Sequence, residues 1–283
     1  MGSAAAGLPL LTTPKANSSP GIRIKLGFNL TLTSDVERAA RLIAKRGHVA
    51  VLTGAGISAD SGIPTFRGKD GLWRRFRAEE LATPEAFRRN PRLVWEWYRW
   101  RMEIIARAQP NEGHYALVEL EKLGLVDCLI TQNVDGLHQR AGSKNVIELH
   151  GNIWRARCTK CSYTIVWDEP PPLESLPPRC PRCNNLLRPD VVWFGEPIPE
   201  DAWNNALKCA MSARVMLVIG TSGVVYPAAL LPYIARERGA VVIEINVERS
   251  ALTDDVTDIF LRGRASEVLP QLVRHVKNML SAN

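Results

Sequence analysis

The chain has 283 residues, of which 46% are hydrophobic and 23% are charged, close to the average for a globular protein. No stretch approaches the roughly 18 consecutive apolar residues that span a bilayer, which argues against a membrane protein. The 36 basic and 29 acidic residues give a net charge of +7, compatible with an acidic ligand, with nucleic acid, or with solubility alone.

Residues 1–34 contain no acidic residue and are rich in Gly, Ala, Ser, Thr and Pro, which predicts a disordered tail. The apolar patch at residues 8–11 lacks a preceding basic region, so it does not match a secretory signal. Basic residues are also few and form no amphipathic repeat, unlike a typical transit peptide. We therefore expect a cytoplasmic protein, with mitochondrial import as the alternative.

The segments that follow alternate between strand and helix patterns. A helix is predicted from Asp35, with Ser34 as its N-cap and an apolar face that includes Val36 and Ile43. Four short apolar runs are typical of buried parallel strands, with helical stretches beside them at 113–123 and 228–238. These runs cover residues 48–53, 126–131, 215–220 and 241–246. The alternation predicts an α/β fold with a doubly wound parallel sheet.

Two blocks interrupt this alternation. Residues 68–109 are rich in Arg, Trp and Glu and are predicted to be helical, whereas residues 155–189 combine four cysteines with a proline-rich stretch. We assign both blocks to a smaller inserted domain. The large domain then comprises residues 35–67, 110–154 and 190–277.

The four cysteines form two C-x2-C pairs, Cys158 with Cys161 and Cys180 with Cys183. This spacing is typical of a zinc ribbon, and four thiolates leave no open position for water, so the expected Zn²⁺ is structural. Two disulfides are the alternative. The apolar or helical surroundings of the two other cysteines, Cys128 and Cys209, favour a reducing compartment and therefore zinc.

A glycine-rich loop, Gly54-x-Gly56-x-x-Ala59, follows the first predicted strand and is expected to open a helix. This context is typical of a dinucleotide site, where glycines let the backbone approach a pyrophosphate. A plain tight turn is the alternative. The Gly and Pro residues of segment 61–68 end the helix early, which disfavours a dehydrogenase and suggests a loop that covers the nucleotide.

Seven motifs then occur in an order that resembles the sirtuin family, and the resemblance extends from about residue 35 to the end of the chain. They are GAGISADSGIPTFRG (54–68), TQNVDGLHQRAG (131–142), LHG (149–151), the cysteine pairs, VVWFGE (191–196), GTSGVVYPA (220–228) and INVE (245–248). The resemblance implies a Rossmann-like large domain, a zinc-bearing small domain, and between them a cleft for NAD and an acyl-lysine peptide. It also implies an NAD-dependent protein-lysine deacylase.

Site residues are implied by the same resemblance. Those expected to bind NAD as co-substrate are Gly54, Ala55, Gly56, Ser58, Ala59, Asp60, Thr65, Phe66, Arg67, Trp73, Gln132, Asn133, Asp135, Gly220, Thr221, Ser222, Asn246, Val247, Glu248 and Ala265. His150 is expected to be the general base, with Asn133 and Asp135 also catalytic. An unperturbed histidine pKa near 6.5 suits a base at neutral pH.

Peptide binding is expected along two segments that an extended substrate can join as an added strand. They are Val192, Trp193, Phe194, Gly195 and Glu196, and Gly223, Val224, Val225 and Tyr226.

Tyr98 and Arg101 are three residues apart in a predicted helix and therefore share a face. A phenol and a guanidinium in an acyl tunnel would bind a carboxylate. The pair resembles the signature of class III sirtuins, which act on succinyl-, malonyl- or glutaryl-lysine, and Ala82 aligns with the small residue that enlarges their acyl pocket. The alternative is an exposed Tyr and Arg on a Trp-rich helix. Weaker deacetylation is expected in addition.

Other functions stay open. The enzyme could act mainly as a deacetylase, or it could transfer ADP-ribose to proteins. A nucleic-acid-binding module is disfavoured because the cysteine ribbon has few basic residues between its cysteine pairs. A monomer is the default expectation for the assembly.

Overall fold

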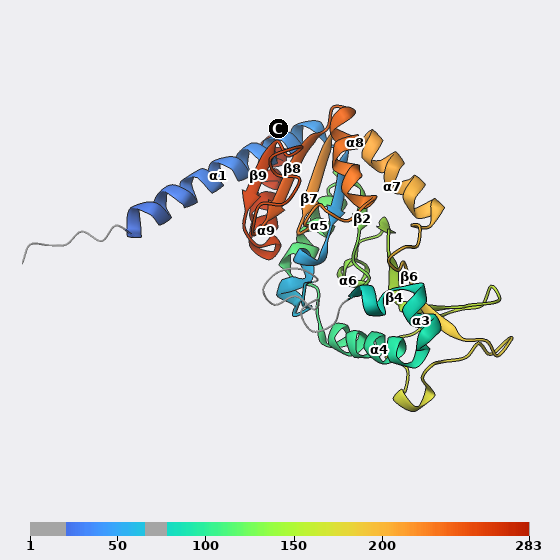
Figure 1. Ribbon diagram of the computed structural model, residues 1–283. Coiled ribbons are helices and arrows are strands. Elements are labelled where there is room, and N and C mark those ends of the chain that lie inside the picture. The colour runs from blue at the N-terminus through green and yellow to red at the C-terminus, as the bar shows by residue number, and fades with distance from the viewer. Residues whose placement is uncertain (1–20, 66–77, 283) are drawn as a thin grey trace, which may run out of the picture.

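The computed structural model describes the backbone of residues 21–65 and 78–282, and the side chains of residues 33–65 and 80–282 (Figure 1). Within these residues the main sheet has six strands in the order β3-β2-β1-β7-β8-β9, and each neighbouring pair is parallel. The strands are β1 (Val49–Thr53), β2 (Val126–Thr131), β3 (Val146–Glu148), β7 (Val215–Ile219), β8 (Val241–Asn246) and β9 (Ile259–Arg262). The predicted doubly wound α/β fold is confirmed.

Helices cover both faces of this sheet. Val49 and Val51 of β1 pack against α1, α5 and α9, whereas Ala50 and Leu52 face α7 and α8, since successive strand residues point to opposite faces (Figure 1). The helices are α1 (Gly21–Arg46), α5 (Glu112–Lys122), α6 (Leu137–Ala141), α7 (Glu200–Ser212), α8 (Leu231–Glu237) after the 3-10 turn η4 (Ala228–Leu230), and α9 (Ala265–Ser281). Burial on both faces explains why the strands read as continuous apolar runs.

The first helix is longer than the sequence indicated. The predicted apolar face, including Val36 and Ile43, is fully buried, but α1 begins at Gly21 rather than at Asp35. The predicted disordered tail therefore differs from the structure over residues 21–34, while residues 1–20 lie outside the described part. Extending a helix already anchored by packing costs less than nucleating one, so residues of low helix propensity can continue it.

A second, antiparallel sheet has the order β5-β4-β6. Its strands are β4 (Gly151–Cys158), β5 (Thr164–Val166) and β6 (Leu187–Val191), with the 3-10 turn η3 (Leu173–Ser175) between β5 and β6. The helices α2 (Ala78–Leu81), α3 (Pro84–Arg89) and α4 (Pro91–Arg107) share a core with it. This sheet starts before the predicted boundary at residue 155 and ends after that at residue 189, because Gly151 pairs with Val191 in addition to the pairs from Ala156–Pro189 to Cys158–Leu187.

Cys128 of β2 and Cys209 of α7 form a disulfide, with their Cα atoms 6.5 Å apart. The sequence interpretation of both as free thiols is therefore corrected. Both side chains belong to the core between the sheet and α7, which brings together cysteines that are 81 residues apart.

None of the helices in the described residues is long and apolar enough to cross a bilayer.

Candidate active site

The glycine-rich loop is held against the loop that follows β7. Gly54 leads from β1 into a short helix, as expected, which is the 3-10 helix η1 (Ala55–Ser61). The Gly56 N–H donates to the carbonyl of Gly220 at 2.8 Å, and a Cβ on Gly56 would lie 2.7 Å from the Gly220 Cα. In this structure the glycines therefore allow two loops to approach each other at the carboxyl edge of the sheet.

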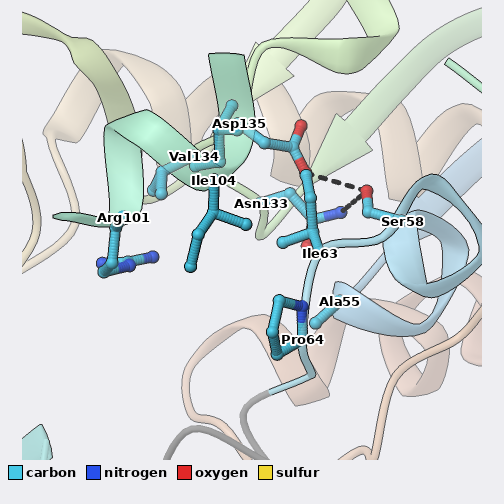
Figure 2. Close-up of a pocket in the computed structure, with 10 residues that line it drawn as sticks. Ala55, Ser58, Ile63, Pro64, Arg101, Ile104, Asn133, Val134 and Asp135 are labelled. Atoms are coloured by element: carbon cyan, nitrogen blue, oxygen red, sulfur yellow. Dashed lines mark hydrogen bonds between the residues drawn. The ribbon is translucent and has the colours of Figure 1, made fainter. Parts of the chain in front are cut away.

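A cavity opens beside this loop, lined by the segment after β1, by α4 and by the segment after β2 (Figure 2). Its lining combines predicted site residues with apolar ones: Ala55, Ser58, Ile63, Pro64, Arg101, Ile104, Ile105, Asn133, Val134 and Asp135. The structure thus brings together five predicted residues from three separate segments. Ile104 and Ile105 were missed, although their spacing of three and four residues from Arg101 places all three on one face of α4.

Ser58, Asn133 and Asp135 are joined by hydrogen bonds at this cavity (Figure 2). The Ser58 hydroxyl donates to the Asp135 carboxylate at 2.8 Å, and the Asn133 amide donates to Ser58 at 3.3 Å and to the Gly54 carbonyl at 3.1 Å. Burial raises the pKa of Asp135, and the hydrogen bonds from Leu137 and Ser58 offset part of that effect. Each polar side chain is therefore fixed in orientation before any ligand binds.

Two buried histidines, His114 and His138, help to hold this group in place. The ring of His138 lies 2.9 Å from the Thr53 hydroxyl, which donates to Thr131 at 2.8 Å, and Thr131 in turn accepts the Asn133 N–H at 3.0 Å. Burial lowers the pKa of His114 to about 4 and holds that of His138 well below its ordinary value. Both rings are thus neutral at neutral pH. No role was predicted for either side chain from the sequence, so this support was missed.

His150 lies just before β4. Its Nδ1 is 3.0 Å from the Gln132 carbonyl oxygen, which can only accept, so Nδ1 carries the proton and Nε2 is left as a base. Burial lowers the pKa of His150, and the bond to Gln132 opposes that effect in part. The ring is therefore held in the tautomer that general base catalysis requires.

Three of the residues expected to bind NAD, Gln132, Thr221 and Asn246, meet around Thr221. The Gln132 amide donates to the Thr221 hydroxyl at 3.0 Å, and the Asn246 amide donates to the Thr221 carbonyl at 2.9 Å. These residues follow β2, β7 and β8, whose carboxyl ends share one edge of the sheet, the usual place for a ligand in such folds. Ser222, which follows Thr221 in the chain, is half-buried, whereas Val247 and Glu248 are exposed.

Other predicted NAD contacts are placed differently. Asp60 forms an ion pair with Arg264 and accepts a hydrogen bond from Ser266, so its carboxylate is directed toward the start of α9. Ala265 is buried there, against Gly113. Ala59 is an exposed residue of η1 and Thr65 is half-buried after it, whereas Phe66, Arg67 and Trp73 lie outside the described residues.

Tyr98 and Arg101 are both buried on α4, so the exposed alternative is excluded. The Trp193 indole donates to the Tyr98 hydroxyl at 2.9 Å, and the Arg101 guanidinium carbon lies 4.9 Å from the Trp97 ring centroid and 5.4 Å from that of Tyr98. Burial raises the pKa of Tyr98 and lowers that of Arg101. Arg101 reaches the cavity, which Tyr98 does not line.

The two predicted peptide segments differ in exposure. Phe194, Val224 and Tyr226 are exposed, whereas Trp193 is buried. The first segment is fixed by backbone hydrogen bonds from Val192 to His150 and from Phe194 to Ala82, each 2.9 Å, and by a two-point ion pair between Glu196 and Arg188. Gly195, Gly223 and Val225 complete the two segments, and Gly195 and Gly223 have positive φ angles of 83° and 70°.

The four ribbon cysteines converge as predicted. Their sulfur atoms all lie within 4.8 Å of one another, with Cys158 to Cys183 at 3.4 Å and Cys161 to Cys180 at 3.6 Å. A tetrahedron with Zn–S bonds of about 2.3 Å has edges of about 3.8 Å, so the donor set fits Zn²⁺. The alternative of two disulfides is wrong, because all four cysteines are free thiols in this structure.

Comparisons with known proteins agree with this site. A family model described as the Sir2 family matches residues 54–227. The NAD-dependent protein deacylase 2 of Pyrobaculum aerophilum is 61% identical over 241 residues, which cover 85% of this chain and 96% of that protein. The crystal structure of a Sir2 homolog–NAD complex has a TM-score of 0.82 at 52% identity, covering 86% of this chain and 94% of that one.

A structure of Sir2Af2 bound to a myristoylated histone peptide is also similar, with a TM-score of 0.73 at 39% identity, covering 88% of this chain and 99% of that one. These relatives span nearly the whole described fold, including both sheets. The chain belongs to the Sir2 family and is an NAD-dependent protein deacylase with a structural zinc site.

Proposed function

We propose that this deacylase prefers lysines that carry a short acidic acyl group, such as succinyl, malonyl or glutaryl, over acetyl-lysine. The observation that carries the proposal is the position of Arg101, which lines the same cavity as Ser58, Asn133 and Asp135. A guanidinium stays charged even when buried, and a carboxylate on the acyl group would supply a matched anion.

Tyr98 supports the same assignment. Because its oxygen accepts from the Trp193 indole at 2.9 Å, its own O–H is oriented away from that bond and can donate to a carboxylate. Arg101 lies beside it, at 5.4 Å from the phenol ring. Tyr98 does not itself line the cavity, so a carboxylate would have to extend past the cavity wall beside Arg101 to accept from both donors, and such an anion would be favoured over an uncharged acetyl group.

The catalytic roles follow from the fixed polar groups. NAD, when bound, supplies the ADP-ribosyl acceptor for the acyl group and releases nicotinamide. His150 accepts a hydroxyl proton at Nε2, because its Nδ1–H is committed to the Gln132 carbonyl. Asn133 and Asp135, both tied to Ser58, keep their orientation without rearranging.

The peptide would bind in extended form between residues 192–196 and 223–226. Exposed Phe194, Val224 and Tyr226 would flank it, and main-chain hydrogen bonds would supply most of the affinity. We therefore expect broad tolerance of the sequence around the modified lysine.

Removal of a long acyl chain is the second candidate. It is supported by the similarity to Sir2Af2, which was solved with a myristoylated histone peptide, and by the apolar cavity residues Ile63, Ile104 and Ile105. The position of Arg101 in the cavity lining opposes it, because an alkyl chain offers no hydrogen-bond acceptor to a guanidinium that it would remove from water.

The test is a kinetic panel in which one peptide carries acetyl-, malonyl-, succinyl-, glutaryl- or myristoyl-lysine, with O-acyl-ADP-ribose measured by mass. The acidic acyl groups should give the highest kcat/KM, and Arg101→Met should remove that advantage. Arg99→Met is the matched control, because Arg99 lies on the same helix but pairs with Glu103 and Pro171. Higher activity on acetyl- or myristoyl-lysine in the wild type would refute the acidic preference, and label transfer from NAD to protein would indicate ADP-ribosylation instead.

A further inference from the structure

A second hollow lies far from the active-site loops, between α1 and the amino ends of β8 and β9. It has a volume of about 340 Å³ and is lined by Arg38, Arg41, Leu42, Lys45, Val241 and Asp258. Val241 begins β8 and Asp258 precedes β9, so the hollow lies at the edge of the sheet opposite the carboxyl ends that carry the active site.

Arg38, Arg41 and Lys45 form what we call the basic face of α1. Their spacing of three and four residues places them on one side of the helix, and all three are exposed. The helix is held in place beneath them by Val36 and Ile43, which are fully buried. The three cations are therefore presented together on a rigid element.

The positive charge extends beyond α1. Arg46 and Arg214 each donate to the other's backbone carbonyl at 3.4 Å, which places a second pair of guanidinium groups at the same edge. Asp258, the one acid among the described residues that line the hollow, already pairs with Arg236 at 2.5 Å and accepts the Val242 N–H at 2.9 Å. Its charge is thus committed within the fold and leaves the face cationic.

We propose that the basic face of α1 binds the phosphate backbone of double-stranded nucleic acid without reading its sequence. Duplex DNA carries about one negative charge per 1.7 Å of its axis, so a row of cations on one helix can contact several phosphates. Protein interfaces instead rely on aromatic or arginine anchors in apolar pockets. Among the described residues that line the hollow, none is aromatic, and its two arginines are exposed on the surface of one helix rather than enclosed in an apolar pocket.

From the sequence, the net charge of +7 is compatible with nucleic acid, but the cysteine ribbon, with few basic residues between its pairs, disfavours a nucleic-acid-binding module. In the structure the basic residues gather instead on α1, the helix that lies farthest from the ribbon along the chain. The proposed binding involves neither the zinc site nor the acyl preference. Binding here would leave the cavity at Arg101 accessible, because the two hollows lie at opposite edges of the sheet.

The test is fluorescence anisotropy of the full-length protein with a random duplex of about 20 base pairs, at salt concentrations from about 50 to about 200 mM. In the triple variant Arg38→Ala, Arg41→Ala, Lys45→Ala, Kd at the lowest salt should rise about tenfold or more, and the slope of log K against log salt should fall by about 2 to 3. Arg88→Ala, Arg89→Ala, Arg92→Ala is the control, since it removes the same charge from exposed positions of α3 and α4. Its affinity should stay near that of the wild type.

Three results would overturn the proposal: no binding by the wild type at the lowest salt, equal losses in both triple variants, or competition by polyglutamate as effective as that by unlabelled duplex. Equal losses would mean that net charge alone drives binding, and effective polyglutamate would indicate an acidic protein partner. Deacylation of a short peptide by the first triple variant should be unchanged, which separates this test from that of the acyl preference.

Discussion

The expected role of His150 as the general base depends on one backbone contact. The Gln132 carbonyl fixes the proton on Nδ1, so Nε2 is free to accept another. Replacing His150 by Asn should lower kcat by about 10² to 10⁴, the usual contribution of a general base. Stopped assays with saturating peptide and NAD would measure the loss, with zinc content and melting temperature as controls for folding. A kcat near that of the wild type would exclude His150 as the base.

The pH profile gives an independent check on the same side chain. The reactive form is the neutral imidazole, so kcat/KM should rise with pH through the pKa of His150 and then level off. Because burial lowers that pKa below its ordinary value of 6.5, the plateau should already be reached at neutral pH. If kcat/KM instead reached half of its plateau only above neutral pH, the pKa of His150 would not be lowered by burial as described.

The contact between the loops after β1 and β7 makes Gly56 sensitive to substitution. A Cβ there would lie 2.7 Å from the Gly220 Cα and 2.8 Å from its carbonyl oxygen, and backbone atoms cannot swing aside. Gly56→Ala should cost about 1 to 3 kcal/mol of unfolding free energy, as overpacking does elsewhere. Urea denaturation would measure it. Unchanged stability would mean that the two loops can separate.

The zinc ribbon should respond to metal removal as a local unit. The four thiolates tie the ends of β4 and β6, and Trp167 after β5 packs against Trp95 of α4 at 5.4 Å between ring centroids. A chelator should therefore expose the amides of β4, β5 and β6 to hydrogen exchange before those of β1 and β7. Simultaneous exposure of both sheets would show that the small sheet does not depend on zinc.

Elements were easier to predict from the sequence than their contacts. The runs at β2 and β8 were located to the residue because strands buried on both faces are apolar throughout. The cysteine spacing likewise predicted convergence, since each pair is local. By contrast, the approach of Gly56 to Gly220, and the bond from Trp193 to Tyr98, join residues far apart in the chain. No local pattern encodes them, and the same holds for the disulfide between Cys128 and Cys209.

At the level of the whole molecule, the buried histidines should make the fold sensitive to acid. The pKa of His114 is lowered to about 4 by burial, so between about pH 6.5 and 4 the unfolded chain binds more protons than the folded one. Stability should therefore fall as pH drops through this window, by about 3 kcal/mol from His114 alone. His138, whose pKa is also lowered, adds to the effect.

Denaturation series at several pH values would measure this dependence, with His114→Gln as the matched variant. Gln keeps a polar side chain but does not titrate, so its stability should depend less steeply on pH over the same window. Parallel curves for the two proteins would mean that His114 does not carry the acid sensitivity.

The most direct test of the acidic acyl preference is the ratio of kcat/KM for succinyl-lysine to that for acetyl-lysine in a double-mutant cycle of Tyr98→Phe and Arg101→Met. Each change should lower the ratio, and the double variant should be little worse than Arg101→Met alone, because both side chains would act on the same carboxylate. A ratio that stays at the wild-type value in Arg101→Met would contradict the account and leave Arg101 as a structural cation of the α4 core.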